Sequence, residues 1–482
     1  MKEEKKEIGL TVKKSENMPE WYSQVVQKSE LAEHAPAKGC YVIRPLGYFI
    51  WECIQQKFDK RIKELGVDNT YFPMFIPESF FQKEAAHFDG FTPELAWVAN
   101  RDEGCDRLAL RPTSEAIMCD SFSKWVRSWR DLPLRINQWC NVVRWETKAT
   151  KLFLRSREFL WQEGHCVYAT EDECDREVLM MLEEYDKLCK DLLALPVMCG
   201  RKTEKEKFAG AKATFSIEAF LPDGKAIQAG TSHNLGQGFM KAFDVSFLGQ
   251  DGEKHTPFHS SWGISTRLIG TAVMMHGDDK GLVLPPRIAR NQVVIIPIIF
   301  EKTRDQVIQK AEEIYSQLKE FRPVLDDREE ATPGAKYHEW ELKGVPIRIE
   351  IGPRDLAEEQ VVLVRRDNSE KQFIKIKDLK EVVAQELDMI HDSMYKKAME
   401  HLTESQVEAN DWDSFVSCIN ARKLVKVNYC EEPACEDMIK EKTGGASSRN
   451  IQFGEVGAPQ EGSTCFHCGK PATCRLFFSK SY

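Results

Sequence analysis

Residues 144–165 read RWETKATKLFLRSREFLWQEGH and mix charged with large apolar side chains. Five cations and three carboxylates lie in this stretch: Arg144, Lys148, Lys151, Arg155, Arg157, Glu146, Glu158 and Glu163. The flanking segments RINQWCNVVRWE and REFLWQEGHCVY are typical of two strands, so we expect a cationic loop between them. Arginine makes bidentate bonds to phosphate oxygens, and an aromatic side chain on the second strand offers a face for a base. The alternative is a charged hairpin with internal ion pairs, and the stretch taken alone favours it.

Composition narrows the class of protein. A chain of 482 residues with 42% hydrophobic and 30% charged residues predicts a soluble protein of two or three domains. No apolar run is long enough for a membrane span, and the N-terminal MKEEKKEIGLTVKKSE lacks the apolar core of a secretory signal. The net charge of −9 argues against general binding to DNA but leaves room for a local basic groove. Fifteen scattered cysteines predict a reducing, cytoplasmic compartment.

Hydrophobic periodicity divides the chain into three parts. Apolar residues at 51, 54, 58, 62 and 65 predict a helix that ends at Gly66, followed by the extended segment NTYFPMFIP. A helix is expected over 170–195, and ATFSIEAFL and KAIQAGTSHNLG are expected to be strands joined by a turn at PDG. From Asn291 onward strands alternate with helices, which indicates a compact α/β domain. We therefore place domains at 1–289, 290–395 and 396–482, the last with a cysteine-bearing tail.

Three further motifs offer polar groups to a ligand. In RPTSE, at 111–115, Thr113 and Glu115 can point into one pocket and hold an ammonium group, although Thr113 or Ser114 could instead cap the following helix. The glycines of AIQAGTSHNLGQGF, at 226–239, allow a backbone to approach a ligand closely, but the signal is weak. SSWGISTRLIG, at 260–270, puts Arg267 on an incoming helix, where an internal ion pair is the alternative.

Taken together, these segments resemble the three signature motifs of class II aminoacyl-tRNA synthetases, and in particular the prolyl-tRNA synthetase family of archaeal and eukaryotic type. The first motif is the helix at 48–65 with the strand ending in PMFIP, the second is RWE…FLRSREFLWQEGH, and the third is WGISTRLIG…GLVLPPRIA. The resemblance covers nearly the whole chain. It implies an α+β fold: an antiparallel six-stranded catalytic sheet flanked by helices, an α/β anticodon-binding domain and a C-terminal zinc-binding domain. It also implies a homodimer through the first motif.

The resemblance implies a proline–tRNA ligase that uses ATP with Mg²⁺. The proline carboxylate would attack the α-phosphate, giving prolyl-adenylate and pyrophosphate, and the prolyl group would pass to the 3′ end of proline tRNA. Such a reaction needs positioning and charge stabilisation rather than a side-chain nucleophile. About sixty residues separate His165 from Ala226, so no editing insertion is expected.

Site residues follow from the same resemblance. Arg144 and Arg267 are the expected catalytic residues. The residues expected to bind ATP are Arg144, Glu146, Arg155, Ser156, Phe159, Gln228, Thr231, Ser265 and Arg267. Those expected to bind proline are Thr113, Glu115, Arg144, Trp161, Phe208 and His233, with Phe91 as a further wall. Glu218 is either a ligand of Mg²⁺ or a structural carboxylate, and Lys148 and Lys151 face either tRNA or solvent.

The C-terminal two-fifths of the chain carry two further predictions. Cys430-x₄-Cys435 and Cys465-x₂-Cys468 supply the four thiolates of a tetrahedral zinc site, with four free thiols as the alternative. His467, between two ligands, is expected to point away, and Cys474 is a spare. In GVPIRIEIGPRDL, the resemblance assigns Glu350 and Arg354 to the anticodon, against an internal ion pair. The C-terminal Tyr482 is expected to pack toward the catalytic domain.

Three rival functions deserve comparison with this prediction. A threonine-specific synthetase would need three zinc ligands in its pocket, which RPTSE and GTSHNLG do not supply. A non-catalytic tRNA-binding relative should have lost the arginines that hold phosphates, yet Arg144, Arg155 and Arg267 are all present. A zinc-dependent nucleic-acid-binding module fits poorly with the acidic balance of the chain.

Overall fold

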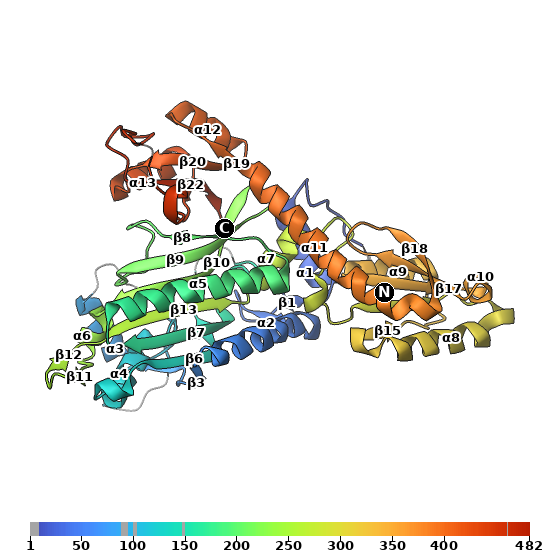
Figure 1. Ribbon diagram of the computed structural model, residues 1–482, viewed down its shortest axis with the longest axis horizontal. Coiled ribbons are helices and arrows are strands. Elements are labelled where there is room, and N and C mark those ends of the chain that lie inside the picture. The colour runs from blue at the N-terminus through green and yellow to red at the C-terminus, as the bar shows by residue number, and fades with distance from the viewer. Residues whose placement is uncertain (1–8, 88–94, 100–103, 147–149, 460) are drawn as a thin grey trace.

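The computed structural model describes residues 9–87, 95–99, 104–146, 150–459 and 461–482. A region built on a large sheet lies at one end of the elongated molecule and a smaller α/β region lies at the other (Figure 1). The long helix α11 (Leu379–Ser405) runs from the α/β region to a small C-terminal region. This helix is continuous through positions 395 and 396, where the sequence predicted a domain boundary.

Six antiparallel strands form the centre of the large sheet, as the sequence predicted. The short strand β3 (Asp68–Asn69) adds to one edge in parallel. In spatial order the six strands are β6 (Leu134–Val143), β7 (Glu158–Tyr168), β13 (Phe258–Ser265), β10 (Lys225–Gly236), β9 (Ala213–Phe220) and β8 (Met198–Arg201).

Helices cover this sheet because their apolar residues recur on one side. In α5 (Glu171–Leu193) the buried Val178, Leu182 and Tyr185 repeat at helical spacing, and Thr170 forms a capping box at the start of the helix. Helix α2 (Pro45–Glu64) ends before Gly66, whose φ of +80° suits a helix end. The other elements of this region are α1 (Met18–Lys28), β1 (Ala32–His34), β2 (Tyr41–Ile43), β4 (Phe75–Pro77), α3 (Glu78–His87), β5 (Leu108–Leu110), α4 (Glu115–Trp125), α6 (Gly238–Ala242), β11 (Phe247–Leu248), β12 (Lys254–His255) and α7 (Arg267–His276).

Strands β7 and β13 pack closely at one glycine. Gly164 lies directly opposite Trp262, and a Cβ on Gly164 would come within 2.2 Å of the indole. Only glycine leaves room for this buried ring, which packs with Phe58 and Tyr185 in the core. The contact holds the second and third motifs side by side and so fixes the floor of the site described below.

The α/β region has a five-stranded sheet, and its alternation of strands and helices agrees with the sequence prediction. Its order is β15 (Pro323–Leu325), β14 (Val293–Pro297), β16 (Ile347–Ile351), β17 (Gln360–Arg365) and β18 (Lys371–Lys375), with the first three strands parallel and the last two antiparallel to their neighbours. Helices α8 (Arg304–Gln317) and α11 pack on one face and α9 (Pro333–Leu342) on the other. The continuous apolar run of β14 therefore has both faces buried. The short α10 (Pro353–Ala357) joins β16 to β17.

The C-terminal region shares a sheet with the catalytic strands. Its elements are β19 (Gln406–Glu408), α12 (Trp412–Asn420), β20 (Leu424–Tyr429), α13 (Pro433–Lys442), β21 (Ser447–Ser448) and β22 (Cys474–Ser481). Strand β22 pairs with β20 and, at its end, in parallel with β10. The Tyr482 hydroxyl donates to Asp223 over 2.5 Å, which confirms that the C-terminal residue packs on the catalytic region.

Lys151, which was predicted to face either tRNA or solvent, is half-buried against two aromatic rings. Its ammonium group is 5.1 Å from the centre of the Tyr482 ring and 5.2 Å from that of Tyr22. These cation–π contacts hold the ammonium group beside the two rings. Lys148 and Phe91 lie outside the described residues. In the part of the chain that the structure describes, no helix is long and apolar enough to cross a membrane.

Candidate active site

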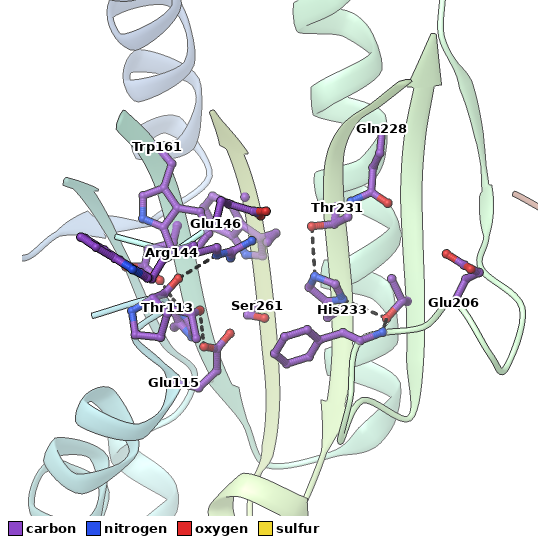
Figure 2. A pocket seen from close by; sticks show the side chains of 18 residues that line it. Thr113, Glu115, Arg144, Glu146, Trp161, Glu206, Gln228, Thr231, His233 and Ser261 are labelled. Atoms are coloured by element: carbon purple, nitrogen blue, oxygen red, sulfur yellow. Dashed lines mark hydrogen bonds and ion pairs between the residues drawn. The ribbon is translucent and has the colours of Figure 1, made fainter. Parts of the chain in front are cut away.

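A cavity of about 520 Å³ opens over the large sheet and collects residues from RPTSE, from the second and third signature motifs and from strand β10 (Figure 2). Half of the 18 lining residues were predicted from the sequence to bind ATP or proline. These nine are Thr113, Glu115, Arg144, Glu146, Trp161, Phe208, Gln228, Thr231 and His233. The second motif and the strand β10 thus face a common space, although long stretches of sequence separate them.

Arg144 projects into one end of this cavity from the residue after β6. Its Nε donates to the carbonyl of Pro112 over 3.1 Å, and its guanidinium lies 5.5 Å from the ring centres of both Phe159 and Trp161. Phe159 and Trp161 meet edge to face, with centres 6.1 Å apart. The aromatic rings hold the guanidinium in place and leave it without a carboxylate partner among the described ion pairs, so it is available to an anionic ligand.

Arg155 and Arg267 lie beside this end of the cavity, although neither forms its wall. Arg267 is the first residue of α7, and it donates to the carbonyls of Leu154 and Gln228, each over 3.2 Å. Burial, together with the nearby charges of Arg144 and Arg155, lowers the pKa of Arg267 to about 10. Three cations held close together, of which only Arg155 has an ion pair among those described, form a site for a polyanion.

The two serines predicted to bind ATP are occupied by the protein backbone. The Ser156 hydroxyl is buried and donates to the carbonyl of Glu158 over 2.7 Å. The Ser265 hydroxyl accepts from the backbone N–H of Arg267 over 3.3 Å. Both hydroxyls hold the chain around the arginines. Glu146 lies 4.0 Å from Arg155 and lines the cavity beside it.

The opposite end of the cavity holds a buried carboxylate. Glu115 is 4% exposed and accepts a hydrogen bond from Thr113 (Figure 2). Ser114 occupies the N-cap position of α4, but its hydroxyl donates to Glu163 and makes no capping bond. Thr113 and Glu115 of RPTSE line the cavity and Ser114 reaches Glu163 in its floor, which favours the ligand-binding interpretation over the helix cap.

His233 forms an uncharged wall. Its Nδ1 lies 2.9 Å from the Thr214 hydroxyl and its Nε2 lies 3.0 Å from the Thr231 hydroxyl. The ring centre is 5.1 Å from that of Phe208. Burial lowers the pKa of His233 to about 3, and the charge of His165 acts in the same direction, so the imidazole is neutral near pH 7. Phe208, Trp161 and neutral His233 together border a space suited to a small apolar ring.

The sequence analysis missed two residues of the floor, Glu163 and His165. Both line the cavity, and they follow Trp161 at alternate positions of β7, so strand periodicity from Trp161 could have identified them. Glu163 accepts from Gln138 over 2.6 Å and lies 3.2 Å from Nε2 of His165. Burial opposes ionisation of Glu163, but the hydrogen bonds from His165, Ser114 and Gln138 outweigh it and lower its pKa.

Below them, His165 contacts a second buried imidazole. Its Nδ1 lies 3.2 Å from Nε2 of His259, which is fully buried. Burial favours the neutral form of His165, yet its hydrogen bond to Glu163 and the charge of Glu115 raise its pKa. The ionised form of His165 therefore offsets two carboxylates that would otherwise repel each other under the cavity.

The contacts of Glu218 support the structural alternative over a ligand of Mg²⁺. It is fully buried and does not line the cavity. One carboxylate oxygen pairs with Lys202 over 2.5 Å and the other with Arg449 over 3.3 Å. With both oxygens held by cations, Glu218 has no free oxygen for a metal ion, and it joins the catalytic sheet to the C-terminal region.

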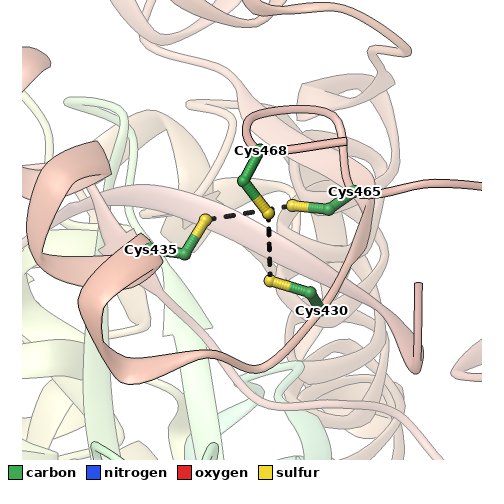
Figure 3. Close-up of side chains that lie close together, drawn as sticks. All are labelled: Cys430, Cys435, Cys465 and Cys468. Carbon is green, nitrogen blue, oxygen red and sulfur yellow. Dashed lines mark hydrogen bonds between the residues drawn. The ribbon is translucent and has the colours of Figure 1, made fainter. Parts of the chain in front are cut away.

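Four cysteines of the C-terminal region converge as predicted (Figure 3). The Sγ atoms of Cys430, Cys435, Cys465 and Cys468 all lie within 4.8 Å of one another, with separations of 3.6 Å between Cys430 and Cys468 and 3.9 Å between Cys435 and Cys465. A tetrahedral zinc with Zn–S bonds of about 2.3 Å requires sulfur atoms about 3.8 Å apart. The arrangement therefore fits a zinc ion.

His467 points toward this cluster, so the expectation that it points away is wrong. Its Nδ1 lies 3.1 Å from Sγ of Cys435, and Lys442 lies 3.2 Å from its Nε2. Since an ammonium group can only donate, Nε2 accepts and Nδ1 carries the proton that faces the sulfur. Cys474 lies outside the cluster, with its sulfur 3.8 Å from the carbonyl of Tyr429.

The two residues assigned to the anticodon lie at the end of β16. Glu350 is buried and accepts from Nε of Arg348 over 2.9 Å, so the internal ion pair that was the alternative is present. Arg354 lies on α10 and is exposed. Of the two, only Arg354 is freely open to a ligand in this conformation.

Family comparisons agree with this architecture. Residues 95–276 match the family described as tRNA synthetase class II core domain (G, H, P, S and T). Residues 292–386 match an anticodon binding domain, and residues 412–482 match the C-terminal domain of prolyl-tRNA synthetase. The fold and the cavity are thus those of the class II aminoacyl-tRNA synthetases.

Full-length relatives narrow the assignment. The chain is 48% identical to a proline--tRNA ligase of Natranaerobius thermophilus over 97% of both chains, and 48% identical to one of Alkaliphilus oremlandii over 100% of both. It is 44% identical to proline--tRNA ligase 2 of Bacillus cereus over 99% of this chain and 100% of the relative. The chain belongs to the proline–tRNA ligase family. Because these relatives are bacterial, the archaeal and eukaryotic type stays a prediction.

Proposed function

We propose that this chain activates L-proline with ATP and transfers the prolyl group to the 3′ end of proline tRNA. The observation that carries the proposal is one cavity with two unlike ends. At one end Arg144, Arg155 and Arg267 lie close together, and among the described ion pairs only Arg155 has a carboxylate partner, Glu146 at 4.0 Å. At the other, a buried carboxylate lies next to an uncharged wall of rings. A nucleotide triphosphate and a small cyclic amino acid need these two environments side by side.

Proline would bind with its ring between Trp161, Phe208 and His233. Its ammonium group would donate to the carboxylate of Glu115 and to Thr113, which already share a hydrogen bond. A charged histidine here would repel the ammonium group, so the low pKa of His233 favours binding. The proline carboxylate would then point toward Arg144, at the boundary between the two ends of the cavity.

In the first step a proline carboxylate oxygen would bond to the α-phosphorus of ATP while the bond from that phosphorus to pyrophosphate breaks. Arg144 would contact the reacting carboxylate and α-phosphate, and Arg267 would hold the γ-phosphate, so their charges would offset the charge that develops in the transition state. Phe159 would stack on the adenine. Mg²⁺, when bound with ATP, neutralises further phosphate charge.

Proline-dependent ATP–pyrophosphate exchange tests this proposal directly. The purified chain should exchange pyrophosphate into ATP with L-proline and show far less exchange with the other amino acids of a full panel. Preference for threonine or for any other amino acid, or no exchange with any of them, would contradict it. Charging of proline tRNA by the same preparation tests the second step.

Four further assignments belong to this proposal. The four-cysteine cluster holds a structural Zn²⁺, supported by its sulfur separations. The domains divide at 289/290 and 395/396, the second division lying within α11. The compact stretch between the second and third motifs, together with the zinc region, supports the archaeal and eukaryotic type without an editing insertion. None of the fifteen cysteines, all of which the structure describes, forms a disulfide, in keeping with a cytoplasmic location.

We also infer a homodimer through the first motif. Three large apolar side chains of this motif are exposed: Tyr48 on α2 (42%), Tyr71 before β4 (71%) and Phe75 in β4 (45%). Such a group on one surface is typical of an interaction site. Light scattering after size exclusion should give twice the chain mass at micromolar concentration. A monomer at that concentration, or a dimer unaffected by Phe75→Arg, would rule out this interface.

A further inference from the structure

Strand β18, at the edge of the α/β sheet, exposes an aromatic ring between two lysines. Phe373 is 69% exposed, and Lys371 and Lys375 flank it at alternate positions, so all three project from the same face. The residues between them face inward: Gln372 donates to Glu386 on α11 over 2.8 Å, and Ile374 packs on the core. These anchors fix the orientation of the strand and keep the Phe373 ring directed outward.

The strand register places Phe373 in line with Glu350. Phe373 is paired with Val362 of β17, and Val362 is paired with Glu350 of β16. Directly paired residues lie on the same face of a sheet, so the three side chains form one row. Strands are about 4.8 Å apart, which puts the backbones of Glu350 and Phe373 roughly 10 Å from each other.

This part of the face is uncovered. Helix α9 packs over β14, where Tyr337 and Trp340 contact Val294 and Ile296. Beyond Glu350 the row continues into the half-buried Val362 and the exposed Phe373. The exposed part of this row therefore begins beyond the buried Glu350, at the half-buried Val362, and reaches the edge of the sheet at Phe373.

The charges along this edge suit an anionic partner. Among the described ion pairs neither lysine contacts a carboxylate, and the Lys375 ammonium donates only to the carbonyl of Glu358, over 2.7 Å. Each lysine is about 7 Å along the strand from Phe373, one on either side. Lysines alone are a usual protection of an edge strand against pairing with other sheets. That protection does not account for a largely exposed phenylalanine between them.

We propose that Phe373 stacks on an unpaired base of the tRNA anticodon loop while Lys371 and Lys375 bind the adjoining phosphates. The region matches an anticodon binding domain, and proteins bind single-stranded RNA by stacking bases on exposed aromatics beside a cationic path. The backbone of Glu350, which the resemblance assigns to the anticodon, lies roughly 10 Å from that of Phe373 in the same row of the sheet. The assignment rests on the proposed function, which makes tRNA a substrate.

Phe373→Ala in the full chain tests the stacking. Removal of one stacking partner should weaken binding of a proline tRNA transcript, and kcat/KM for tRNA in aminoacylation, by about 5- to 150-fold. Proline-dependent ATP–pyrophosphate exchange, which needs no tRNA, should stay unchanged. Phe373→Trp should restore binding. The matched control is Met389→Ala, which removes a 49% exposed apolar side chain from α11 and should leave every value unchanged.

A second pair of substitutions tests the phosphates. Lys371→Ala with Lys375→Ala should reduce the slope of log affinity against log salt by about 1.4, because each single-strand phosphate contact contributes about 0.7. The loss should also appear with a synthetic hairpin that carries only the anticodon stem and loop, and not with an acceptor-stem minihelix.

Several results would overturn this inference. Unchanged tRNA affinity in Phe373→Ala would mean that the face serves only as a protected edge or binds a partner other than tRNA. Equal losses in the Ala and Trp variants, or a matching loss of pyrophosphate exchange, would indicate damage to the fold rather than lost stacking. Absence of proline-dependent exchange in the unmodified chain would instead refute the proposed function, so the two failures are distinct.

Discussion

The substitution Arg267→Met distinguishes the effect of the arginine cluster on folding stability from its contribution to catalysis. Methionine retains helix propensity and an unbranched side chain but removes the guanidinium. Without ATP, the lost hydrogen bonds to the carbonyls of Leu154 and Gln228 are worth about 0.5–1.5 kcal/mol each. The substitution also removes the repulsion between Arg267 and the charges of Arg144 and Arg155, the same charges that help to lower the pKa of Arg267. This second effect increases the free energy of unfolding. The free energy of unfolding should therefore change by about 2 kcal/mol or less.

The same substitution should greatly reduce activity. If Arg267 holds the γ-phosphate in the transition state, its removal should lower kcat for proline-dependent pyrophosphate exchange by about 10²- to 10³-fold, equivalent to about 2.7–4 kcal/mol. The KM for proline should change little, because the amino-acid end of the cavity has no contact with Arg267. Arg176→Met is the control, since Arg176 is 71% exposed on α5 and pairs only with Asp172.

Denaturant unfolding and exchange kinetics on the same preparations decide the matter. A kcat within about threefold of the unmodified chain would refute the assignment of Arg267 to the phosphates. A loss of stability well above the expected figure, with activity falling in proportion to folded protein, would refute the view that the cluster is unfavourable without its ligand.

Three other predictions concern separate parts of the molecule. Glu218→Gln should cost about 3–5 kcal/mol of stability, because it leaves two buried cations short of a partner, and should not alter the Mg²⁺ dependence of exchange; a shifted Mg²⁺ dependence would reinstate the metal role. Because the pKa of His233 is lowered to about 3, below about pH 6.5 the unfolded chain binds a proton at this residue that the folded chain does not bind. His233 therefore lowers the free energy of unfolding by at most about 1.4 kcal/mol per pH unit as the pH falls. Urea unfolding at pH 7 and 5.5 should show a smaller loss of stability in His233→Gln than in the unmodified chain, and an equal loss would contradict the low pKa. Metal analysis should find one zinc per chain and less in Cys468→Ser, whereas His467→Ala should weaken zinc binding by about 10- to 100-fold; full zinc occupancy in Cys468→Ser under competition by a chelator would contradict a four-thiolate site.

The sequence predicted local structure most accurately where the apolar residues repeat with a single period. The apolar spacing of α2 and its end at Gly66 were readable because helix geometry repeats every few residues. The strands β6 and β7 and the α/β alternation after Asn291 were readable for the same kind of reason. By contrast, the length of α11 was underestimated, because nothing in its sequence marks the point where it leaves one region and enters another.

The sequence predicted only some of the residues that form the site. Side chains inside recognisable motifs, such as Thr113 and Trp161, line the cavity as expected. Glu163 lay in the quoted motif but received no role, since its importance comes from partners on other strands. His259 is 94 residues from His165, and no local pattern joins them.

The amino-acid sequence by itself determined which chemical groups are present in which local elements: arginines in a loop and at a helix start, thiols in two close pairs, and strands and helices of given period. Only the tertiary structure decided how those groups are neutralised. Arg449, 231 residues from Glu218, pairs with that carboxylate, and the ring of the C-terminal Tyr482 lies beside the half-buried ammonium group of Lys151. The physical reason is that the charge state and availability of a side chain depend on burial and on its nearest partners, and folding brings those partners from distant parts of the chain.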